Sequence, residues 1–194
     1  MTTQTPSRPK PNTPPRTPPM ESSNEAKPEQ LDLARKQGEA VMNALDYMAN
    51  KEAHSGGKKA AGDYLVAYAC ETAEGLWHMK DGELVFEKPK KENAHLEIAV
   101  LDGADHRFIP GLTVHLTVTD SDGNEVGSHV QPFLWHPWIY HYGRNWELPG
   151  DGTYTFHVRI EPPAFARHDP KNGKRYAEPV EVTFENVDVK TGQK

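Results

Sequence analysis

The stretch that decides the fold class is His95-Leu-Glu-Ile-Ala-Val-Leu101, in which large apolar residues stand at every second position. Successive side chains of a β-strand point to opposite faces of the sheet. One face therefore carries the residues expected in the core: Leu96, Ile98 and Val100. The opposite face carries His95 and Glu97, whose spacing of two residues places them about 6.5–7 Å apart along the strand. An imidazole and a carboxylate at that separation can both reach one metal ion, or they can form a surface His–Glu pair.

Similar short runs, separated by turn signals such as Asp122-Gly123 and Asn172-Gly173, fill the rest of the chain after Gly62. The predicted strands are Tyr64–Cys70, Leu84–Glu87, His95–Leu101, Leu112–Thr119, Val126–Trp135, Asn145–Leu148, Thr153–Ile160 and Val180–Phe184. Short strands without intervening helices are typical of antiparallel sandwiches. We therefore predict an all-β fold, an immunoglobulin-like antiparallel β-sandwich over residues 63–190.

Two different segments precede this predicted sandwich. Residues 1–27 are rich in Pro, Thr, Ser, Lys and Arg and have almost no large apolar side chains, so we expect a disordered Pro-rich tail. From Pro28 to near Glu52 the apolar residues follow helical spacing, namely Leu31, Ala34, Val41, Leu45 and Met48. The Ser55-Gly56-Gly57 run predicts a break, so residues 28–62 are interpreted as a helix and linker.

The composition excludes several classes of protein and site. The formal net charge of -6 disfavours nucleic acid or an anionic membrane surface as a partner. The single cysteine, Cys70, allows neither an internal disulfide nor a CxxC zinc motif. A metal would therefore be held by imidazole and oxygen, with Met thioether as a further option. No apolar stretch approaches the ~20 residues of a membrane helix, and no signal-peptide core follows the N-terminus. The protein is then cytoplasmic, or its export signal is missing from this sequence.

The segment from Phe133 to Asn145, FLWHPWIYHYGRN, is the richest in side chains that carry chemistry. Pro137 and Gly143 favour a loop over a continuous strand, and such a loop could bring His136 and His141 to one site. Two other interpretations stay open for this segment. It could be simple aromatic packing, or a sugar-binding face formed by Trp135, Trp138 and Tyr140.

Two further histidines belong to neighbouring predicted elements. His115 alternates with apolar residues in Leu112–Thr119 and could share the face of His95, although a surface position is the simpler interpretation. His168 lies in Arg167-His168-Asp169, a loop after the strand Thr153–Ile160. Imidazoles with a carboxylate suit Cu(II), Fe(II) or Zn(II). The spacing of these residues in the sequence does not show whether the histidines and Glu97 meet in space.

The chain from His95 to about Asn186 resembles the bacterial periplasmic iron-transport family, which includes spirochaete metal-binding lipoproteins and iron-uptake proteins of Gram-negative pathogens. The pieces that carry the resemblance are HLEIAV, FIPGLTVHLTV, WHPWIYHYGRN, LPGDGTYTFHVRIEPP and FARHD, in the family's order. The resemblance implies an immunoglobulin-like sandwich, a homodimer, a copper site near the dimer surface and an adjoining iron site. The Pro-rich tail and the helix at 28–52 fall outside it.

The resemblance also implies a ligand set for the copper site. Its HxE strand gives His95 and Glu97, its HYG loop gives His141 and its RH loop gives His168. The family's methionine ligand corresponds to Leu134 here, so that ligand is absent, and His136 is a candidate to compensate. The remaining nitrogen and oxygen donors favour Cu(II), Zn(II) or Fe(II) over Cu(I).

The predicted function is therefore that of a non-enzymatic metal-binding protein in an iron or copper uptake system. By resemblance it is extracytoplasmic, captures Cu2+ and/or Fe2+, with Zn2+ as a further candidate, and hands the ion to a membrane iron permease. The alternative is a carbohydrate- or protein-binding β-sandwich module that uses the loop of Trp135, Trp138 and Tyr140. A third hypothesis is a copper-dependent oxidase, for which the sequence offers no evident base or substrate cleft.

Overall fold

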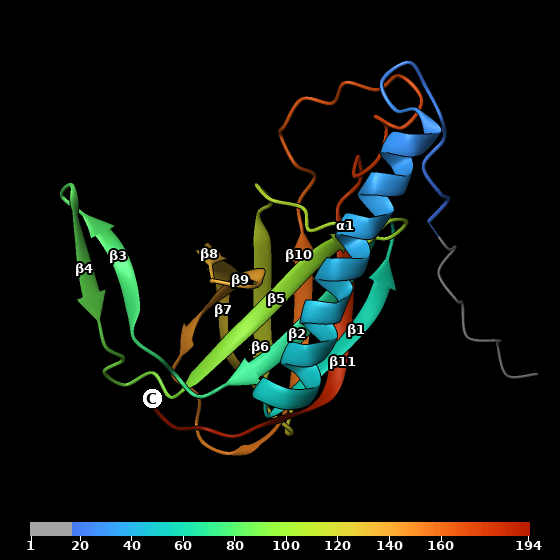
Figure 1. The fold of residues 1–194 in the computed structure, drawn as a ribbon. Helices are drawn as coiled ribbons and strands as arrows, with labels where there is room; N and C mark the ends of the chain where they lie inside the picture. Colours follow the sequence, from blue (N-terminus) through green and yellow to red (C-terminus); the bar gives the residue numbers. More distant parts are fainter. Residues whose placement is uncertain (1–16) are drawn as a thin grey trace, which may run out of the picture.

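The computed structural model describes residues 17–194, and all but two of the strands there form two antiparallel sheets packed face to face (Figure 1). The larger sheet has the order β1 (Ser55–Ala61), β2 (Tyr64–Glu71), β5 (Ala94–Asp102), β9 (Tyr140–Trp146) and β8 (Phe133–Trp135). The second has the order β11 (Val180–Val189), β10 (Gly152–Ile160), β6 (Val114–Thr119) and β7 (Glu125–Gln131). The predicted antiparallel sandwich is confirmed.

The alternation along β5 sorts its side chains as the sequence predicts. The inner-face residues are fully buried in the main core between the two sheets, namely Leu96, Ile98 and Val100. The core includes large residues of both sheets, among them Tyr64, Tyr142, Phe156 and Ile160. Burial of their apolar surface is the main term that stabilises the sandwich.

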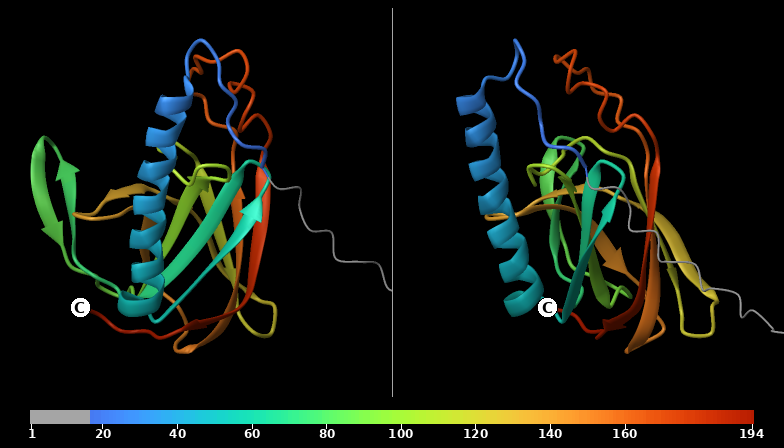
Figure 2. Two further views of the ribbon diagram at one scale, coloured as in Figure 1. Left: turned by 45° about the vertical axis from the view of Figure 1, so that its right-hand side comes forward. Right: turned by 90° about the vertical axis from the view of Figure 1, so that its right-hand side faces the viewer.

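The outer face of the larger sheet is covered by the helix α1 (Pro28–Tyr47) and by η1 (Met48–Glu52), a single π-helical turn that continues it. Figure 2 shows the helix lying along one side of the sandwich. A second apolar cluster joins helix and sheet and contains Leu45, Met48, Ala67, Ala69, Ala99, Leu101 and Ile139. All nine residues of β5 are therefore buried, on both faces. The helix ends near Glu52, as predicted.

Gly38 lets the helix approach the body closely. A Cβ built at Gly38 would lie 1.6 Å from the carbonyl oxygen of Asp105, in the turn that follows β5. Any side chain at Gly38 would therefore push the helix away from the sheet. The glycine that interrupts the helical pattern in the sequence has a packing role.

The structure corrects several predicted elements. Residues 55–61, interpreted as a break and linker, form the edge strand β1, where Gly56 packs against Ala49 of η1. The predicted strand Val126–Trp135 is two strands, β7 and β8, which belong to different sheets. The predicted loop at 133–145 is mostly the β8–β9 hairpin. Pro137 lies at the turn of this hairpin, and Gly143 is part of β9, where it pairs with Glu97 of β5.

A further hairpin, β3 (Leu76–Lys80) and β4 (Glu83–Glu87), stands away from the two sheets (Figure 1). The sequence predicts only its second strand. Its exposed large side chains are Trp77, Met79, Leu84, Val85 and Phe86.

The predicted tail is described only in part, since residues 1–16 lie outside the described residues. Residues 17–27 have no helix or strand before α1, but hydrogen bonds tie them to the loop 161–179. The Ser23 hydroxyl donates to Asp169, and the Lys171 ammonium donates to the carbonyl of Ser22. No helix within residues 17–194 is both long enough and apolar enough to cross a membrane.

Candidate metal centre

Three of the predicted ligands meet on the outer face of the larger sheet. His95 and Glu97 come from β5, and His141 comes from the neighbouring strand β9. Glu97 Oε1 lies 3.8 Å from His95 Nε2 and 3.6 Å from His141 Nε2. One donor atom from each residue lies within 4.8 Å of the others, which is the spacing that one bound ion would need.

Space between the two imidazoles comes from Gly143, which pairs with Glu97 across β5 and β9. A Cβ at Gly143 would lie 3.0 Å from His141 Cδ2 and 3.3 Å from His95 Nε2. A larger residue would therefore occupy the position between the donor atoms. The HYG motif contributes its glycine to the centre as well as its histidine.

Asn145 fixes the orientation of His95. Asn145 Oδ1 lies 2.9 Å from His95 Nδ1 and also accepts from the backbone N–H of Glu74, while its Nδ2 donates to the Glu74 carbonyl. The His95 Nδ1–H must therefore be the donor, which leaves the lone pair of Nε2 facing Glu97. A partner on the second ring nitrogen is the usual way in which metal-binding histidines are oriented.

The donor atoms of the centre have no other partners. His95 Nε2, both ring nitrogens of His141 and His136 Nδ1 are buried, and none has a hydrogen-bond partner among residues 17–194. A buried polar atom without a partner costs about 1–3 kcal/mol, so such atoms rarely gather in one place without a reason. A bound metal ion would accept the lone pairs of these nitrogens. The imidazoles and the Glu97 carboxyl are groups that bind transition metals, so the residues present fit such an ion.

Burial also sets the protonation of these groups. It lowers the pKa of His95, against the raising effect of the Asn145 hydrogen bond, and it lowers the pKa of His141 to about 3. Burial, together with the charges of Glu71 and Glu74, raises the pKa of Glu97 to about 8. Both imidazoles are therefore neutral at pH 7, which is the form that binds metals.

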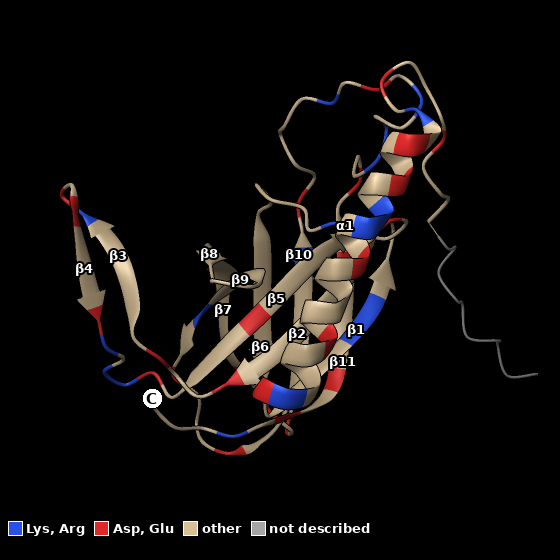
Figure 3. Ribbon diagram, viewed as in Figure 1, with Lys and Arg blue, Asp and Glu red and all other residues tan. Residues whose placement is uncertain are grey.

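The centre opens to a cavity of about 270 Å³ at the end of the helix. Its walls are formed by Tyr47, Met48, Glu52, Glu71, Glu74, Glu97, His136, Trp138 and Lys194. Figure 3 shows acidic positions on β5, at the end of β2 and in the last helical turn grouped in this region. Glu74 Oε1 lies 3.9 Å from His95 Nε2, and Lys194 forms ion pairs with Glu71 and Glu74.

Glu71 and Glu74 also lie at the centre, although the sequence patterns did not indicate them. Glu71 pairs with His95 in the β2–β5 register, and Glu74 follows shortly after β2 ends. Only the pairing of these two strands brings the carboxylates to the imidazole. A sequence signal would have required knowledge of which strands are neighbours.

His136, the predicted fourth donor, lies beside the centre. It is on the turn between β8 and β9, with its ring centroid 6.4 Å from that of His141 and 5.5 Å from that of Trp138. Trp138 in turn packs edge-on against Tyr47 of the helix. Tyr140 packs elsewhere, against Phe108 and Phe133, so the aromatic residues of this hairpin divide between two places.

His168 and His115 are not brought to the centre within one chain. His168 is exposed in the loop 161–179, next to Asp169, which is bonded to Ser23 ahead of the helix. Figure 1 shows this loop at the opposite end of α1 from the centre, and a 20-residue helix spans about 30 Å. His115 lies on the other sheet, with Nε2 3.7 Å from Glu161 Oε1, so it is a surface residue.

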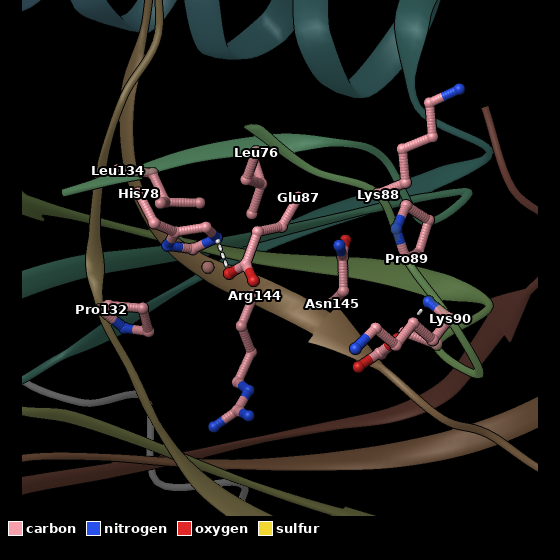
Figure 4. Close-up of a pocket in the computed structure, with 12 residues that line it drawn as sticks. Leu76, His78, Glu87, Lys88, Pro89, Lys90, Pro132, Leu134, Arg144 and Asn145 are labelled. Atoms are coloured by element: carbon pink, nitrogen blue, oxygen red, sulfur yellow. Dashed lines mark hydrogen bonds and ion pairs between the residues drawn. The ribbon is translucent and has the colours of Figure 1, made fainter. Parts of the chain in front are cut away.

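A larger cavity of about 470 Å³ borders the centre from another side. It lies between the β3–β4 hairpin and β9, and Gly143 and Asn145 form part of its wall. Figure 4 shows Leu134 beside His78 in this cavity, with His78 facing Glu87 at 3.9 Å. Leu134, which pairs with His141, adds an apolar side chain here and no donor atom.

Comparisons with known proteins identify the family and the fold. The family model described as Fe2+ transport protein matches residues 43–190. The fold is similar to that of FetP from uropathogenic Escherichia coli strain F11, with 22% identity and a TM-score of 0.56 over 69% of this chain and 93% of FetP. A copper-bound variant of FetP gives 22% identity and a TM-score of 0.57, over 70% of this chain and 90% of the variant.

Copper-reconstituted P19 from Campylobacter jejuni has the same fold, with 18% identity and a TM-score of 0.57 over 71% of this chain and 96% of P19. No curated protein matches the sequence of this chain. These structural likenesses establish the shared fold, and the family model extends over most of the chain. The chain belongs to the Fe2+ transport protein family.

Proposed function

We propose that this protein binds a divalent transition-metal ion, Cu2+ and/or Fe2+, as cargo of an iron uptake system. The observation that carries the proposal is the set of buried imidazole nitrogens around Glu97 that have no partner among residues 17–194. Membership of the Fe2+ transport protein family supports the iron assignment, and the copper-bound FetP and P19 structures support copper.

The ligands would be His95 Nε2, His141 Nε2 and the Glu97 carboxylate, with His136 as a fourth donor from the β8–β9 turn. Asn145 would hold the first of these imidazoles in place. Imidazole and carboxylate donors suit Cu2+ and Fe2+, and they would also accept Zn2+. The chain's own residues therefore define a neutral pair of imidazoles beside one titratable carboxyl.

The acidic residues at the opening of the cavity, here called the acidic mouth, would assist capture of the ion. Glu52, Glu71 and Glu74 line the cavity through which the centre meets solvent, and Lys194 offsets part of their charge. A cleft lined by one sign of charge raises the local concentration of the opposite ion. The mouth would thus favour cations over the anions of the surrounding solution.

The predicted ligand His168 would reach a centre only from a second copy of the chain, because its own loop lies at the far end of α1. We propose a homodimer on this ground, together with the resemblance described above. His168→Ala should then weaken metal binding in a sample of dimers and leave the affinity of an isolated monomer unchanged. Sedimentation combined with metal titration at several protein concentrations tests this, and equal affinities under all conditions would contradict it.

We further propose that the protein acts outside the cytoplasm, as a carrier that transfers the ion to a membrane iron permease and not as an enzyme. The recombinant expression of FetP in the periplasm supports this location. Transfer requires a centre that opens to the surface, and the cavity beside Glu97 provides such an opening. A pull-down of permease from membranes by metal-loaded protein, compared with metal-free protein, tests the transfer step.

The central experiment is elemental analysis and metal titration of the wild type and of His141→Ala. The wild type should bind one equivalent of Cu2+ or Fe2+ per chain, and the variant should lose it. His157→Ala is a matched control, because His157 is an exposed histidine bonded to Thr183 on the other sheet. Equal stoichiometry in the wild type and His141→Ala would overturn the proposal.

A further inference from the structure

Met48 occupies an unusual place beside the metal centre. It begins η1, the π-helical turn that extends α1, and the Ala53 N–H donates to its carbonyl at 2.9 Å to close this turn. The residue is only 4% exposed, and it lines the same cavity as Glu97 and His136. Single π-helical turns are rare and occur often at functional sites.

The sheet beneath Met48 has small side chains. The cluster that contains Met48 includes Ala67, Ala69 and Ala99, and Ala69 pairs with Glu97 across β2 and β5. Alanines at these positions leave room for a long side chain between helix and sheet. Methionine is unbranched and has several rotatable bonds, so its sulfur can adjust to a neighbouring group.

A thioether would change which ion the centre accepts. Imidazole and carboxylate donors alone suit Cu(II), Fe(II) and Zn(II), whereas thioether donors select Cu(I). We propose that Met48 Sδ is a ligand for Cu(I) at this centre, together with His95 and His141. This inference rests on the proposed function and extends it, because it lets one centre hold copper in its reduced state as well.

The alternative role for Met48 is apolar packing, and a pair of conservative variants separates the two. Met48→Leu keeps the volume and the apolar character of the side chain, so the fold should tolerate it. Met42→Leu is the matched control, because Met42 packs against the same apolar cluster but does not line the cavity with Glu97. Both variants lose one thioether, and only the first loses it at the centre.

The test uses the full chain loaded with Cu(I) without oxygen, and with Cu(II) in parallel. X-ray absorption should show a sulfur ligand on Cu(I) in the wild type and in Met42→Leu, and none in Met48→Leu. Competition with a chromogenic Cu(I) chelator should show that Met48→Leu weakens Cu(I) binding by about tenfold or more. Loss of a residue that only orients a ligand already costs about 10–100-fold in metal affinity, so loss of a ligand should cost at least the lower figure. Its Cu(II) affinity should change far less.

The outcomes distinguish this inference from the proposed function. If the wild type binds Cu(I) without a sulfur ligand, or if Met48→Leu and Met42→Leu behave alike, the role of Met48 is wrong and the metal centre stands. If His141→Ala binds both copper ions as the wild type does, the proposed centre itself is wrong.

Discussion

Glu97 on β5 lies directly opposite Gly143 on β9, and the missing side chain of Gly143 leaves the space between the imidazoles of His95 and His141. This cross-strand pair is the geometric basis of the candidate metal centre. Glu97 supplies a carboxylate from β5, and Gly143 on β9 leaves space beside it because it has no side chain.

Gly143→Ala should therefore weaken metal binding. The new methyl group would lie 3.0 Å from His141 Cδ2, 3.1 Å from the Leu96 carbonyl oxygen and 3.3 Å from His95 Nε2, so the imidazoles must shift by a few tenths of an ångström. We expect a loss of affinity of about tenfold or more, comparable to the loss of a supporting contact in other metal sites. Isothermal titration with Cu2+ measures this. Gly152→Ala, where a Cβ meets only Tyr154 at 3.8 Å, is the control that should bind normally.

Metal binding at pH 7 should release about one proton, and that proton should come from Glu97. Burial raises the pKa of Glu97 to about 8, so its carboxyl is mostly protonated, while both imidazoles are already neutral. Coordination requires the carboxylate and so displaces the proton. Titration in buffers of different ionisation enthalpy counts the released protons. Glu97→Gln should release none from this position, and equal release from both proteins would refute the assignment.

The metal-free protein should lose stability as the pH rises because of the same carboxyl. The pKa of Glu97 is about 8 in the folded state and near 4.5 in the unfolded state, so the folded state binds more protons between these values. Stability is therefore full below pH 4.5 and falls up to pH 8. Relative to Glu97→Gln, the wild type should lose a few kcal/mol across this range, since one pKa unit corresponds to about 1.4 kcal/mol.

Urea unfolding with a chelator at pH 5, 7 and 9 measures this difference. The lowered pKa of His141 has the opposite sign, because the unfolded state binds the proton between pH 6.5 and about 3. That contribution is common to the wild type and Glu97→Gln, so it largely cancels in the comparison. A difference between the two proteins that does not vary with pH would exclude a buried, protonated Glu97.

Asn145→Ala should reduce metal affinity without unfolding the protein. Asn145 Oδ1 accepts the Nδ1–H of His95 at 2.9 Å, and its loss would leave that ring free to turn. Removal of such a supporting contact typically costs about 10–100-fold in affinity. Asn145→Asp keeps the acceptor and should recover part of the loss. If Asn145→Ala binds as tightly as the wild type, the hydrogen bond does not position His95.

The sequence by itself determined the features that depend on near neighbours in the chain. Alternation placed Leu96 in the core and set His95 and Glu97 side by side on the other face. Helical spacing placed the helix from Pro28 to Glu52. These features follow from the periods of strand and helix, which local sequence alone fixes.

Only the tertiary structure decided which distant residues join the centre. The pairing of β5 with β9 brings His141 to Glu97, the pairing with β2 brings Glu71, and neither register can be deduced from one strand alone. Gly143 shows the limit clearly, because a glycine that favours a loop in the sequence is an open position inside a strand. The covering helix buries the outer face, and this burial makes the imidazoles neutral and Glu97 a weak acid. Pairing and burial depend on packing of the whole chain, so the candidate donors are visible in the sequence, but only the fold brings His95, Glu97 and His141 together.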